Sequence, residues 1–223
     1  MKLYSGPLSL FSRKVEIALR EKGLPFEREM VPFSQAKGYA PKHPAVLAAN
    51  PKGQVPVLID GDLTVFDSTL IIEYLEDAHP APPLFPSDAK GRARCRLLEL
   101  GADEILLPEV RRLMYRTEPP DPDPERRRYK ETEGRRAEAA ILEHYSGLER
   151  RIDRDGYLCG EFSAADIATF MVVLFALRLK GPRLDAHPAL AAWYARVGAR
   201  PTVAQAAREV AEADRELSST LPP

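Results

Sequence analysis

The sequence predicts an α/β domain followed by an all-helical domain. Up to about residue 79, short runs rich in β-branched and aromatic residues alternate with helical patterns, whereas later apolar residues recur at helical spacing. Between the two halves, the segment from His79 to Pro86 contains four prolines and can form neither a regular helix nor a central strand. We therefore expect a first domain over residues 1–79, a linker over residues 80–87 and a helical domain over residues 88–223.

The first half has the order β-α-β followed by β-β-α. The expected elements are a strand at Met1 to Ser5, a helix at Ser12 to Lys22, a strand at Phe26 to Phe33, strands at Val55 to Ile59 and Leu63 to Phe66, and a helix at Asp67 to Asp77. Gly23 suits the end of the first helix, because glycine adopts the left-handed conformation found there. Asp60, Gly61 and Asp62 predict a tight hairpin turn between the last two strands.

The second half carries only helical patterns. Five segments are expected to be helices: Ala89 to Arg116, Glu125 to Arg154, Ala164 to Leu179, Pro188 to Gly198 and Val203 to Leu217. A proline-rich stretch from Glu118 to Pro124 separates the first two of them. Ser163 and Asp166 have the spacing of a capping box, which is a folding signal rather than a catalytic one. Five successive helices predict a bundle.

Composition narrows the functional classes. The chain has 223 residues, 44% of them hydrophobic, and its 32 Lys and Arg nearly balance 33 Asp and Glu. This near-neutral charge disfavours a nucleic-acid partner, which usually requires a basic surface. The longest apolar run, Phe170 to Leu177, is too short to span a bilayer, and the amino terminus lacks the apolar core of a signal peptide. We expect no membrane association and a reducing cytoplasmic location.

The cysteines and histidines show no pattern typical of a metal site. The two cysteines, Cys95 and Cys159, are far apart in the sequence and form no Cys-x-x-Cys motif, so we interpret both as ordinary helix-face residues. The four histidines lack metal-ligand spacing; they are His43, His79, His144 and His187. We therefore expect no metal.

Two features of the first half point to a ligand. Pro56 stands at the start of an apolar strand, where a proline cannot donate to a ladder, and this predicts a kinked Val55–Pro56 bond of the kind a cis peptide gives. The Val55 backbone would then be free to pair with an extended ligand. Asp67 and Ser68 open a helix whose first amides favour a carboxylate. Together these features predict a site for a small peptide-like anion.

Three segments in this order resemble the cytosolic glutathione transferase family, in particular its bacterial-like members that use serine. They are Asn50-Pro51-x-Gly53-Gln54-Val55-Pro56-Val57-Leu58, Asp67-Ser68-Thr69-x-Ile71-Ile72-Glu73-Tyr74-Leu75, and Gly160 to Ala168. The likeness covers nearly the whole chain. It implies a thioredoxin-like domain that binds glutathione, followed by a helical domain, with glutathione as co-substrate. It also implies a homodimer.

The resemblance places the residue that activates the glutathione thiol after the first strand, near the start of the first helix. Serine- and cysteine-type members carry it six residues before an apolar helix residue and two before an aromatic or small one. Ser9 meets both conditions through Val15 and Phe11. Ser12 is the rival on spacing, and Tyr4 is the rival if the chain resembled members with a strand tyrosine. The absence of cysteine at this position argues against the thiol–disulfide branch of the family.

The resemblance also implies the other contacts. Val55, with Pro56, would pair its backbone with the cysteinyl part of glutathione. Ser68 would hold the γ-glutamyl carboxylate, while Asp67 would face the amino group. The candidates for the glycyl end are Gln54, Lys42 and Lys37. The residues expected around a second, mostly apolar substrate are Leu8, Phe11, Val110, Met114 and Tyr115.

Two classes of function remain open from the sequence. One is an enzyme that conjugates glutathione to a small electrophile, or uses it for a related dehalogenation, reduction or isomerisation. The other is a catalytically silent binding or assembly module with the same fold. Ser9, Val55–Pro56 and Asp67–Ser68 are all present, which favours the enzyme. A glutathione-dependent isomerase like the zeta-type members is a further alternative, although this chain has Ser9-Leu10-Phe11-Ser12 where those members carry a Ser-Ser-Cys-type run.

Overall fold

A computed structural model describes residues 1–152 and 156–218 of the protein. Its contacts group the chain into two compact units. The first consists of Met1–Leu84 together with Pro201–Ser218, and the second comprises residues 85–200. The domain boundaries expected from the sequence stay a prediction. They did not anticipate that the last helix belongs to the first unit.

The first unit is built on one sheet of four strands. The strands are β1 (Lys2–Ser5), β2 (Glu27–Met30), β3 (Val57–Asp60) and β4 (Leu63–Phe66), in the order β2-β1-β3-β4. β1 and β2 are parallel, whereas β1 with β3 and β3 with β4 are antiparallel. Gly61, in the β3–β4 turn, has a φ of 60°, as the predicted hairpin requires. The predicted fold class of an α/β unit plus a helical unit is confirmed.

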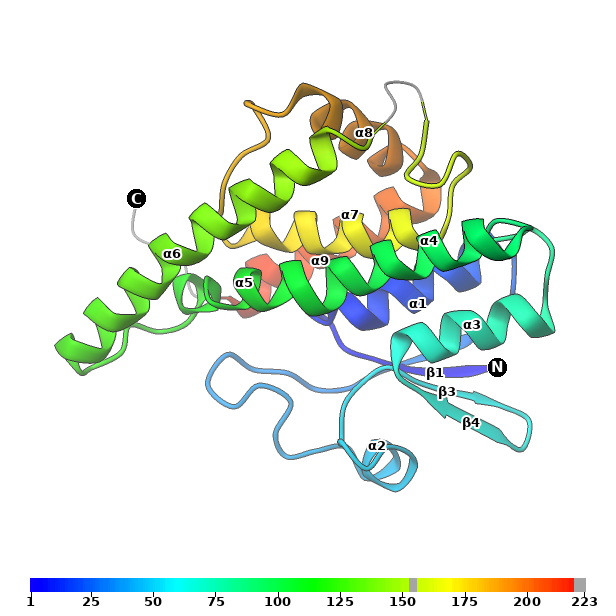
Figure 1. Ribbon diagram of the computed structural model, residues 1–223. Helices are drawn as coiled ribbons and strands as arrows, with labels where there is room; N and C mark the ends of the chain where they lie inside the picture. The colour runs from blue at the N-terminus through cyan, green and yellow to red at the C-terminus, as the bar shows by residue number, and fades with distance from the viewer. Residues whose placement is uncertain (153–155, 219–223) are drawn as a thin grey trace. The chain divides into compact units, whose positions relative to one another are not determined.

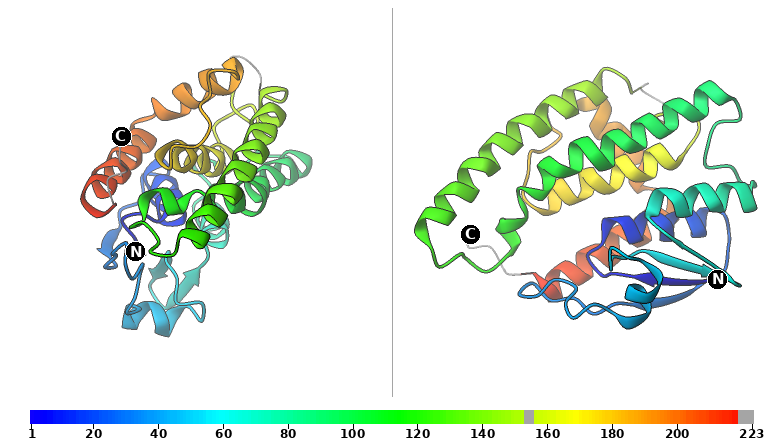
Figure 2. Two further views of the ribbon diagram at one scale, coloured as in Figure 1. Left: turned by 90° about the vertical axis from the view of Figure 1, so that its left-hand side faces the viewer. Right: turned by 60° about the horizontal axis from the view of Figure 1, so that its bottom comes forward.

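Helices cover this sheet. The three long ones are α1 (Leu10–Glu21), α3 (Ser68–Ala78) and α9 (Pro201–Leu217). α1 packs against both α3 and α9 (Figures 1 and 2). A short helix that the sequence analysis missed, α2 (Pro44–Ala49), begins with proline in its first turn, where the missing N–H costs nothing. Only six residues long, it gave too short a periodic signal to be predicted.

The chain that leaves the first unit is anchored by a buried lysine. Lys22 Nζ donates to Glu76 Oε2 at 2.8 Å, to the His79 carbonyl at 2.8 Å and to the Pro82 carbonyl at 3.0 Å. Glu76 Oε2 also accepts from the Leu84 amide at 2.9 Å. All three ammonium protons of Lys22 therefore have acceptors, which compensates for the cost of burying this charge. The proline-rich linker follows a defined path because of these bonds.

The second unit consists of helices. They are α4 (Ala89–Leu100), the π-helix η1 (Gly101–Leu106), α5 (Leu107–Arg111), the 3₁₀-helix η2 (Met114–Thr117), α6 (Pro124–Glu149), α7 (Ala164–Arg178) and α8 (Pro188–Gly198). α7 is apolar on nearly all sides, and it packs against α4, η1, α5 and α8 as the central helix of this unit. Figure 1 shows α7 and α4 side by side.

The structure differs from the sequence prediction at two of these helices. The segment expected as one helix from Ala89 to Arg116 is divided into α4, η1, α5 and η2. Pro108 lies in the first turn of α5; because it has no N–H to donate, a regular α-helix cannot run through this point. The helix expected to reach Arg154 ends at Glu149, and Arg154 itself lies outside the described residues.

The predicted capping motif has a larger role than helix initiation. The Asp166 carboxylate, with no exposed surface, accepts from the Ser163 amide at 3.0 Å and the Ser163 hydroxyl at 2.9 Å. It also accepts from the Leu158 amide at 3.0 Å and from Trp193 Nε1 at 2.8 Å. One carboxylate thus joins the segment before α7, the first turn of α7 and the middle of α8.

We predict that Asp166→Asn destabilises the protein by about 2–4 kcal/mol, because an amide nitrogen cannot accept the bonds and leaves buried donors unpaired. Asp185→Asn is the matched control: its pairing with Arg183 is exposed, so its loss should cost at most about 1 kcal/mol. Urea unfolding of the two variants tests this. Equal midpoints would contradict the role given to Asp166.

Candidate functional site

The strand register brings the predicted site segments to one edge of the sheet. Tyr4 pairs with Val57, and Val57 pairs with Phe66. The loop that follows β1, the residues that precede β3 and the residues that follow β4 therefore leave the sheet together. The first turns of α1 and α3 begin at this edge. In Figure 1 the edge lies where the ends of β1 and β4 meet the start of α3. The fold thus gathers Ser9, Val55 and Ser68 from distant parts of the sequence.

Ser9 is the N-cap of α1. Its Oγ accepts from the Ser12 amide at 3.2 Å, and the residue is 9% exposed. Within residues 1–152 and 156–218, the Ser9 hydroxyl has no acceptor for its own proton. The hydroxyl therefore occupies the positive end of a helix dipole with a proton still available to donate.

The two rival hydroxyls lie in different surroundings. Ser12 has no exposed surface, and its Oγ accepts from the Gly6 amide at 3.3 Å. Tyr4 is buried in a cluster with Val31, Val46 and Val57, where its ring lies 5.3 Å from that of His43. Both residues support the sheet edge from inside the unit.

The segment before β3 presents backbone groups. The Val55–Pro56 bond is cis, as are Ala40–Pro41 and Ala81–Pro82. β3 begins only at Val57, and in the part of the chain that the structure describes neither backbone group of Val55 has a hydrogen-bond partner. Val55 is half-buried and Pro56 buried. An extended ligand could pair with Val55 as an additional strand does.

Asn50, which was not among the residues predicted for the site, shapes this segment. Its Nδ2 donates to the Gln54 carbonyl at 2.7 Å, while its Oδ1 accepts from the Lys52 amide at 2.9 Å. The Asn50 carbonyl accepts from the Gly53 amide at 2.7 Å, and Gly53 has a φ of 58°. The Asn-Pro-x-Gly composition, typical of a turn, was the available signal. Asn50 thereby fixes the chain that leads to Val55.

Asp67 and Ser68 begin α3. Asp67 has a φ of 76°, a conformation that aspartate and asparagine tolerate better than other side chains, and its Oδ1 accepts from the Thr69 amide at 3.1 Å. Asp67 is exposed, whereas Ser68 is 4% exposed. The arrangement places an exposed carboxylate beside the amides of a helix start.

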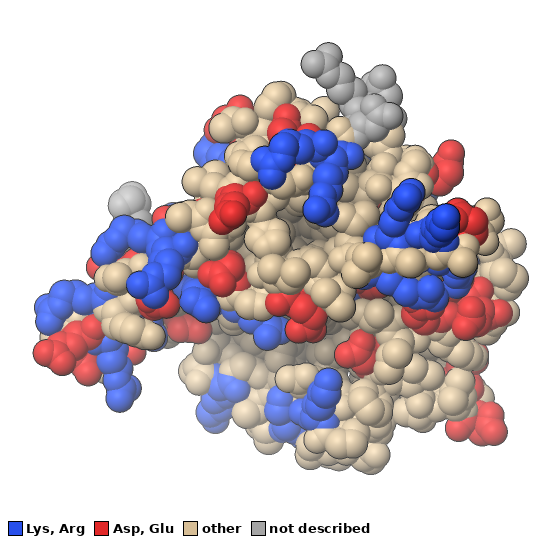
Figure 3. All heavy atoms as spheres, in the orientation of Figure 1, with Lys and Arg blue, Asp and Glu red and all other residues tan. Residues whose placement is uncertain are grey.

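The three candidates for the glycyl end of glutathione, Gln54, Lys37 and Lys42, are exposed. A methyl group placed on Gly53 would lie 3.6 Å from the Cγ and Cδ atoms of Lys42, so this side chain passes close to the turn before Val55. Lys37 stands in a tight turn closed by the Gly38 amide and the Ser34 carbonyl at 2.6 Å. Figure 3 shows one face of the molecule. Over α2 and the loop before it, this face carries Lys and Arg side chains with no Asp or Glu beside them.

A buried charge cluster lies behind the sheet edge. Glu16, with no exposed surface, accepts from the Ser5 hydroxyl at 2.6 Å, from Arg13 Nη1 at 2.8 Å and from Arg28 Nη1 at 2.9 Å. Arg13, only 1% exposed, also donates from Nη2 to the Pro7 carbonyl at 3.2 Å. The loop that presents Ser9 is thus bonded directly to this cluster.

Glu209 of α9 completes the cluster. Its carboxylate pairs with Arg13 and Arg28, and Arg20 Nη2 lies 3.2 Å from its Oε1. Burial alone would raise the pKa of Glu209, but the hydrogen bond from Arg28 and the positive charges of the three arginines outweigh it and hold the pKa below its usual value of 4.5.

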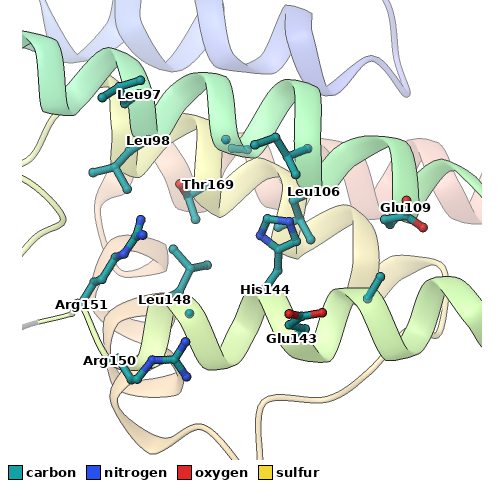
Figure 4. Close-up of a pocket in the computed structure, with 15 residues that line it drawn as sticks. Leu97, Leu98, Leu106, Glu109, Glu143, His144, Leu148, Arg150, Arg151 and Thr169 are labelled. Carbon is teal, nitrogen blue, oxygen red and sulfur yellow. The ribbon is translucent and has the colours of Figure 1, made fainter.

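The predicted second-substrate residues belong to both units. Leu8 and Phe11 are half-buried in the first unit; in the second unit Val110 is buried, Met114 exposed and Tyr115 half-buried. Their common role stays a prediction. The second unit also contains a cavity of about 570 Å³ between α6 and the stretch of α4 and η1, and none of these five residues lines it. In Figure 4 its apolar wall includes Leu97 and Leu106, and the His144 ring points into it.

The described residues contain neither a cluster suited to a metal ion nor a helix suited to span a membrane. No group of three or more His, Cys, Asp or Glu side chains there could hold a metal ion. The sequence interpretation of both cysteines as ordinary helix-face residues is wrong for Cys159, which lies outside the helices of the described residues. Of the helices in residues 1–152 and 156–218, none is long and apolar enough to cross a membrane.

Comparison with known families settles the classification. The family model for the glutathione S-transferase N-terminal domain matches residues 3–83, and that for the C-terminal domain matches residues 107–201. The chain belongs to the glutathione S-transferase family. The family resemblance deduced from the sequence is thereby confirmed, while the serine-type detail stays a prediction.

Individual relatives agree with this classification to different extents. A stringent starvation protein A homolog from Coxiella burnetii is 41% identical over 100 residues, but the match covers only 44% of each chain. The first curated relatives are all matched in this way, over less than half of their length. Glutathione S-transferase 4 of Zea mays is 31% identical over 215 residues, which is 95% of this chain and 92% of the relative.

Solved structures resemble the fold as a whole. A crystal structure of a glutathione S-transferase from Rhodospirillum rubrum has a TM-score of 0.78 and 30% sequence identity, and the alignment covers 92% of this chain and 90% of that one.

The depressed pKa of Glu209 gives a test of the charge cluster. A carboxyl whose pKa is lower in the folded than in the unfolded chain adds stability at pH values above its pKa in the unfolded chain. This contribution is lost as the pH falls through its pKa in the folded chain. We expect the unfolding free energy of the wild type to decrease below about pH 4.5 more steeply than that of Glu209→Gln, so that the two converge in acid. Urea titrations at successive pH values measure this; parallel curves would refute it.

Proposed function

We propose that this protein is a glutathione transferase in which Ser9 donates a hydrogen bond to the glutathione sulfur and so favours the thiolate, which attacks a small, mostly apolar electrophile. One observation carries the proposal. The Ser9 hydroxyl stands at the N-terminus of α1 with its proton uncommitted, at the same sheet edge as the unpaired Val55 backbone. Family membership supports glutathione as the co-substrate.

The residues present fit a tripeptide anion. The unpaired amide and carbonyl of Val55 suit the peptide groups of an extended ligand. The first amides of α3, next to the Ser68 hydroxyl, suit the γ-glutamyl carboxylate, and the exposed Asp67 carboxylate suits its ammonium group. Gln54, Lys42 and Lys37 are the exposed polar groups proposed for the glycyl carboxylate. A second substrate would contact Leu8, Phe11, Val110, Met114 and Tyr115.

The energy required of Ser9 is modest. A free thiol with a pKa of about 8.5 is only about 3% ionised at pH 7. Lowering the pKa by two units, about 2.7 kcal/mol, raises the ionised fraction to about 75%. A charge-assisted hydrogen bond from a hydroxyl together with a helix N-terminus can supply this amount. The serine keeps its proton and forms no covalent bond, so no histidine relay is needed.

A second candidate is a glutathione-binding module without turnover. One similar protein is named a stringent starvation protein A homolog rather than a transferase. Calorimetry with reduced glutathione, followed by assays with halogenated aromatics, epoxides, peroxides, disulfides and isomerisable double bonds, separates the two. Binding with turnover supports the enzyme, and binding without turnover supports the module. No heat at millimolar glutathione would overturn both.

We also propose that the protein forms a homodimer in the cytoplasm. Leu97 and Leu100 of α4 and Ile105 of η1 are 68%, 51% and 51% exposed, and apolar surface of this kind is typically covered by a partner. On the face in Figure 3, acidic and basic side chains are interspersed over the helical unit, which does not favour a nucleic-acid partner. Sedimentation analysis tests the dimer.

We predict that Ser9→Ala lowers conjugating activity at pH 7 by up to about 25-fold and moves its pH midpoint toward 8.5, because the bound thiol loses its hydrogen-bond donor while the helix N-terminus remains. Ser12→Ala is the comparison and should retain most activity. Because Ser9→Ala also removes a helix cap worth about 1 kcal/mol, its stability is compared with that of Asp88→Ala, which uncaps α4. Full activity in Ser9→Ala with loss in Ser12→Ala or Tyr4→Phe would show that the wrong hydroxyl was chosen.

We predict that Asp67→Asn weakens glutathione binding about tenfold, or about 1.4 kcal/mol, while leaving stability nearly unchanged. Asparagine tolerates a positive φ and can still accept from the Thr69 amide, so only the charge facing the ligand ammonium is lost. Isothermal titration calorimetry measures the glutathione affinity, and thermal melting measures the stability. Unchanged affinity would remove Asp67 from the site.

A further inference from the structure

Tyr39 lies against the loop that carries Ser9. It belongs to the connection between β2 and α2, the light-blue loop that leads to α2 in Figure 1. A Cβ atom placed on Gly6 would overlap the Tyr39 hydroxyl oxygen and would lie 2.6 Å from the Cε1 and Cζ atoms of the ring. The phenol therefore packs directly on the backbone of Gly6, which is buried, and only glycine leaves room for it there.

Gly6 is bonded in turn to the start of α1. Its carbonyl accepts from the Ser9 amide at 3.2 Å, and its amide donates to Ser12 Oγ at 3.3 Å. Gly6 thus belongs to the same turn as the N-cap of α1. A displacement of Gly6 would be transmitted through these two hydrogen bonds to the Ser9 hydroxyl.

The Tyr39 ring is held in place by its own loop. Its centroid lies 4.9 Å from that of the Phe33 ring, with 59° between the ring planes. Two backbone hydrogen bonds between Ser34 and Gly38, 3.0 and 2.6 Å long, close a tight turn between these aromatic residues. The phenol therefore has a fixed support from which to press on Gly6.

The same side chain connects the Ser9 loop with the segment before β3. Tyr39 and Val55 are both partly buried, and both pack against one core cluster. The cluster consists of Tyr4, Val31, Val46 and Val57. One aromatic ring thus contacts the loop of the proposed thiol-activating hydroxyl and also the core beneath the backbone proposed to pair with glutathione.

We propose that Tyr39 is a positioning residue for thiol activation: its ring fixes the Ser9 hydroxyl relative to the Val55 backbone, where the cysteinyl part of glutathione would pair. This inference rests on the proposed function and adds a residue to it. The role involves no proton transfer, because Tyr39 acts through Gly6. Placement matters because a hydrogen bond weakens steeply when its donor is out of line, and a shift of about 1 Å can remove much of a catalytic effect.

The test is the pH midpoint of the bound thiol, measured from thiolate absorbance at saturating reduced glutathione. We expect Tyr39→Ala to raise this midpoint by about one unit, half of the two-unit shift assigned to thiol activation, and so to lower the ionised fraction at pH 7 about threefold. Tyr39→Phe should restore most of the shift, because its ring carbons still pack on Gly6. A lower melting temperature in Tyr39→Ala with an unchanged midpoint would indicate a merely structural role and overturn the proposal.

Substitution of Gly6 tests the contact from its other side. Gly6→Ala should raise the midpoint and lower the melting temperature, because the new methyl group clashes with the phenol ring. In the Tyr39→Ala background the same methyl group has room, so the two substitutions should be far from additive. Gly147→Ala in α6 is the matched control: a Cβ atom there meets open space, so it should neither raise the midpoint nor lower the melting temperature. Additive effects of Gly6→Ala and Tyr39→Ala would contradict the contact.

Two results separate this inference from the proposed function. A wild type that binds no glutathione in calorimetry would overturn both. A wild type that binds glutathione with a lowered thiol midpoint, which Ser9→Ala raises while Tyr39→Ala and Gly6→Ala leave it unchanged, would support the proposed function and overturn this inference alone.

Discussion

The buried carboxylate of Glu16 is the constraint on which the first unit depends. A charge without exposed surface is costly unless it is fully paired. Glu16 accepts a hydrogen bond from a strand residue, Ser5, and forms ion pairs with three arginines, Arg13, Arg20 and Arg28. Arg13 extends the same network to the Pro7 carbonyl and to Glu209. The end of β1, the loop before α1 and the last helix are therefore held by a single set of charges. Each of the three arginines pairs with both carboxylates, so the network links these parts of the unit through shared partners.

This arrangement fixes the loop that carries Ser9, the residue proposed to activate the thiol. The stretch from Gly6 to Ser9 has few side chains of its own to fix it, yet its Pro7 carbonyl is tied to a buried guanidinium and its Gly6 amide donates to Ser12. Ser9 can then cap α1 and still keep a proton for another acceptor. A catalytic hydroxyl on a mobile loop would lose part of its interaction free energy when the loop becomes ordered. A hydroxyl on a loop that hydrogen bonds already hold in place avoids this loss.

The sequence predicted what is encoded locally. Caps and turns such as Asp67, Gly23 and Gly61 can be identified because each requires a particular residue type at one backbone position. The pairings that depend on distant residues could not be predicted. Glu209 and Arg13 are 196 residues apart, and the amphipathic pattern of α9 does not reveal which unit its apolar face covers. The π-helix η1, which packs against α7, likewise has no local signal in the sequence. For the site, the family resemblance supplied the candidate residues, and only the fold could show which of them share an edge.

Serine at the start of α1 would limit what the first unit can do with a bound thiol. A hydroxyl there could donate a hydrogen bond to the glutathione sulfur but could not form a disulfide with it, so under the proposed function the first unit would activate glutathione without being oxidised by it. Both cysteines, Cys95 and Cys159, belong to the second unit. The proposed activation would therefore use no thiol of the protein itself.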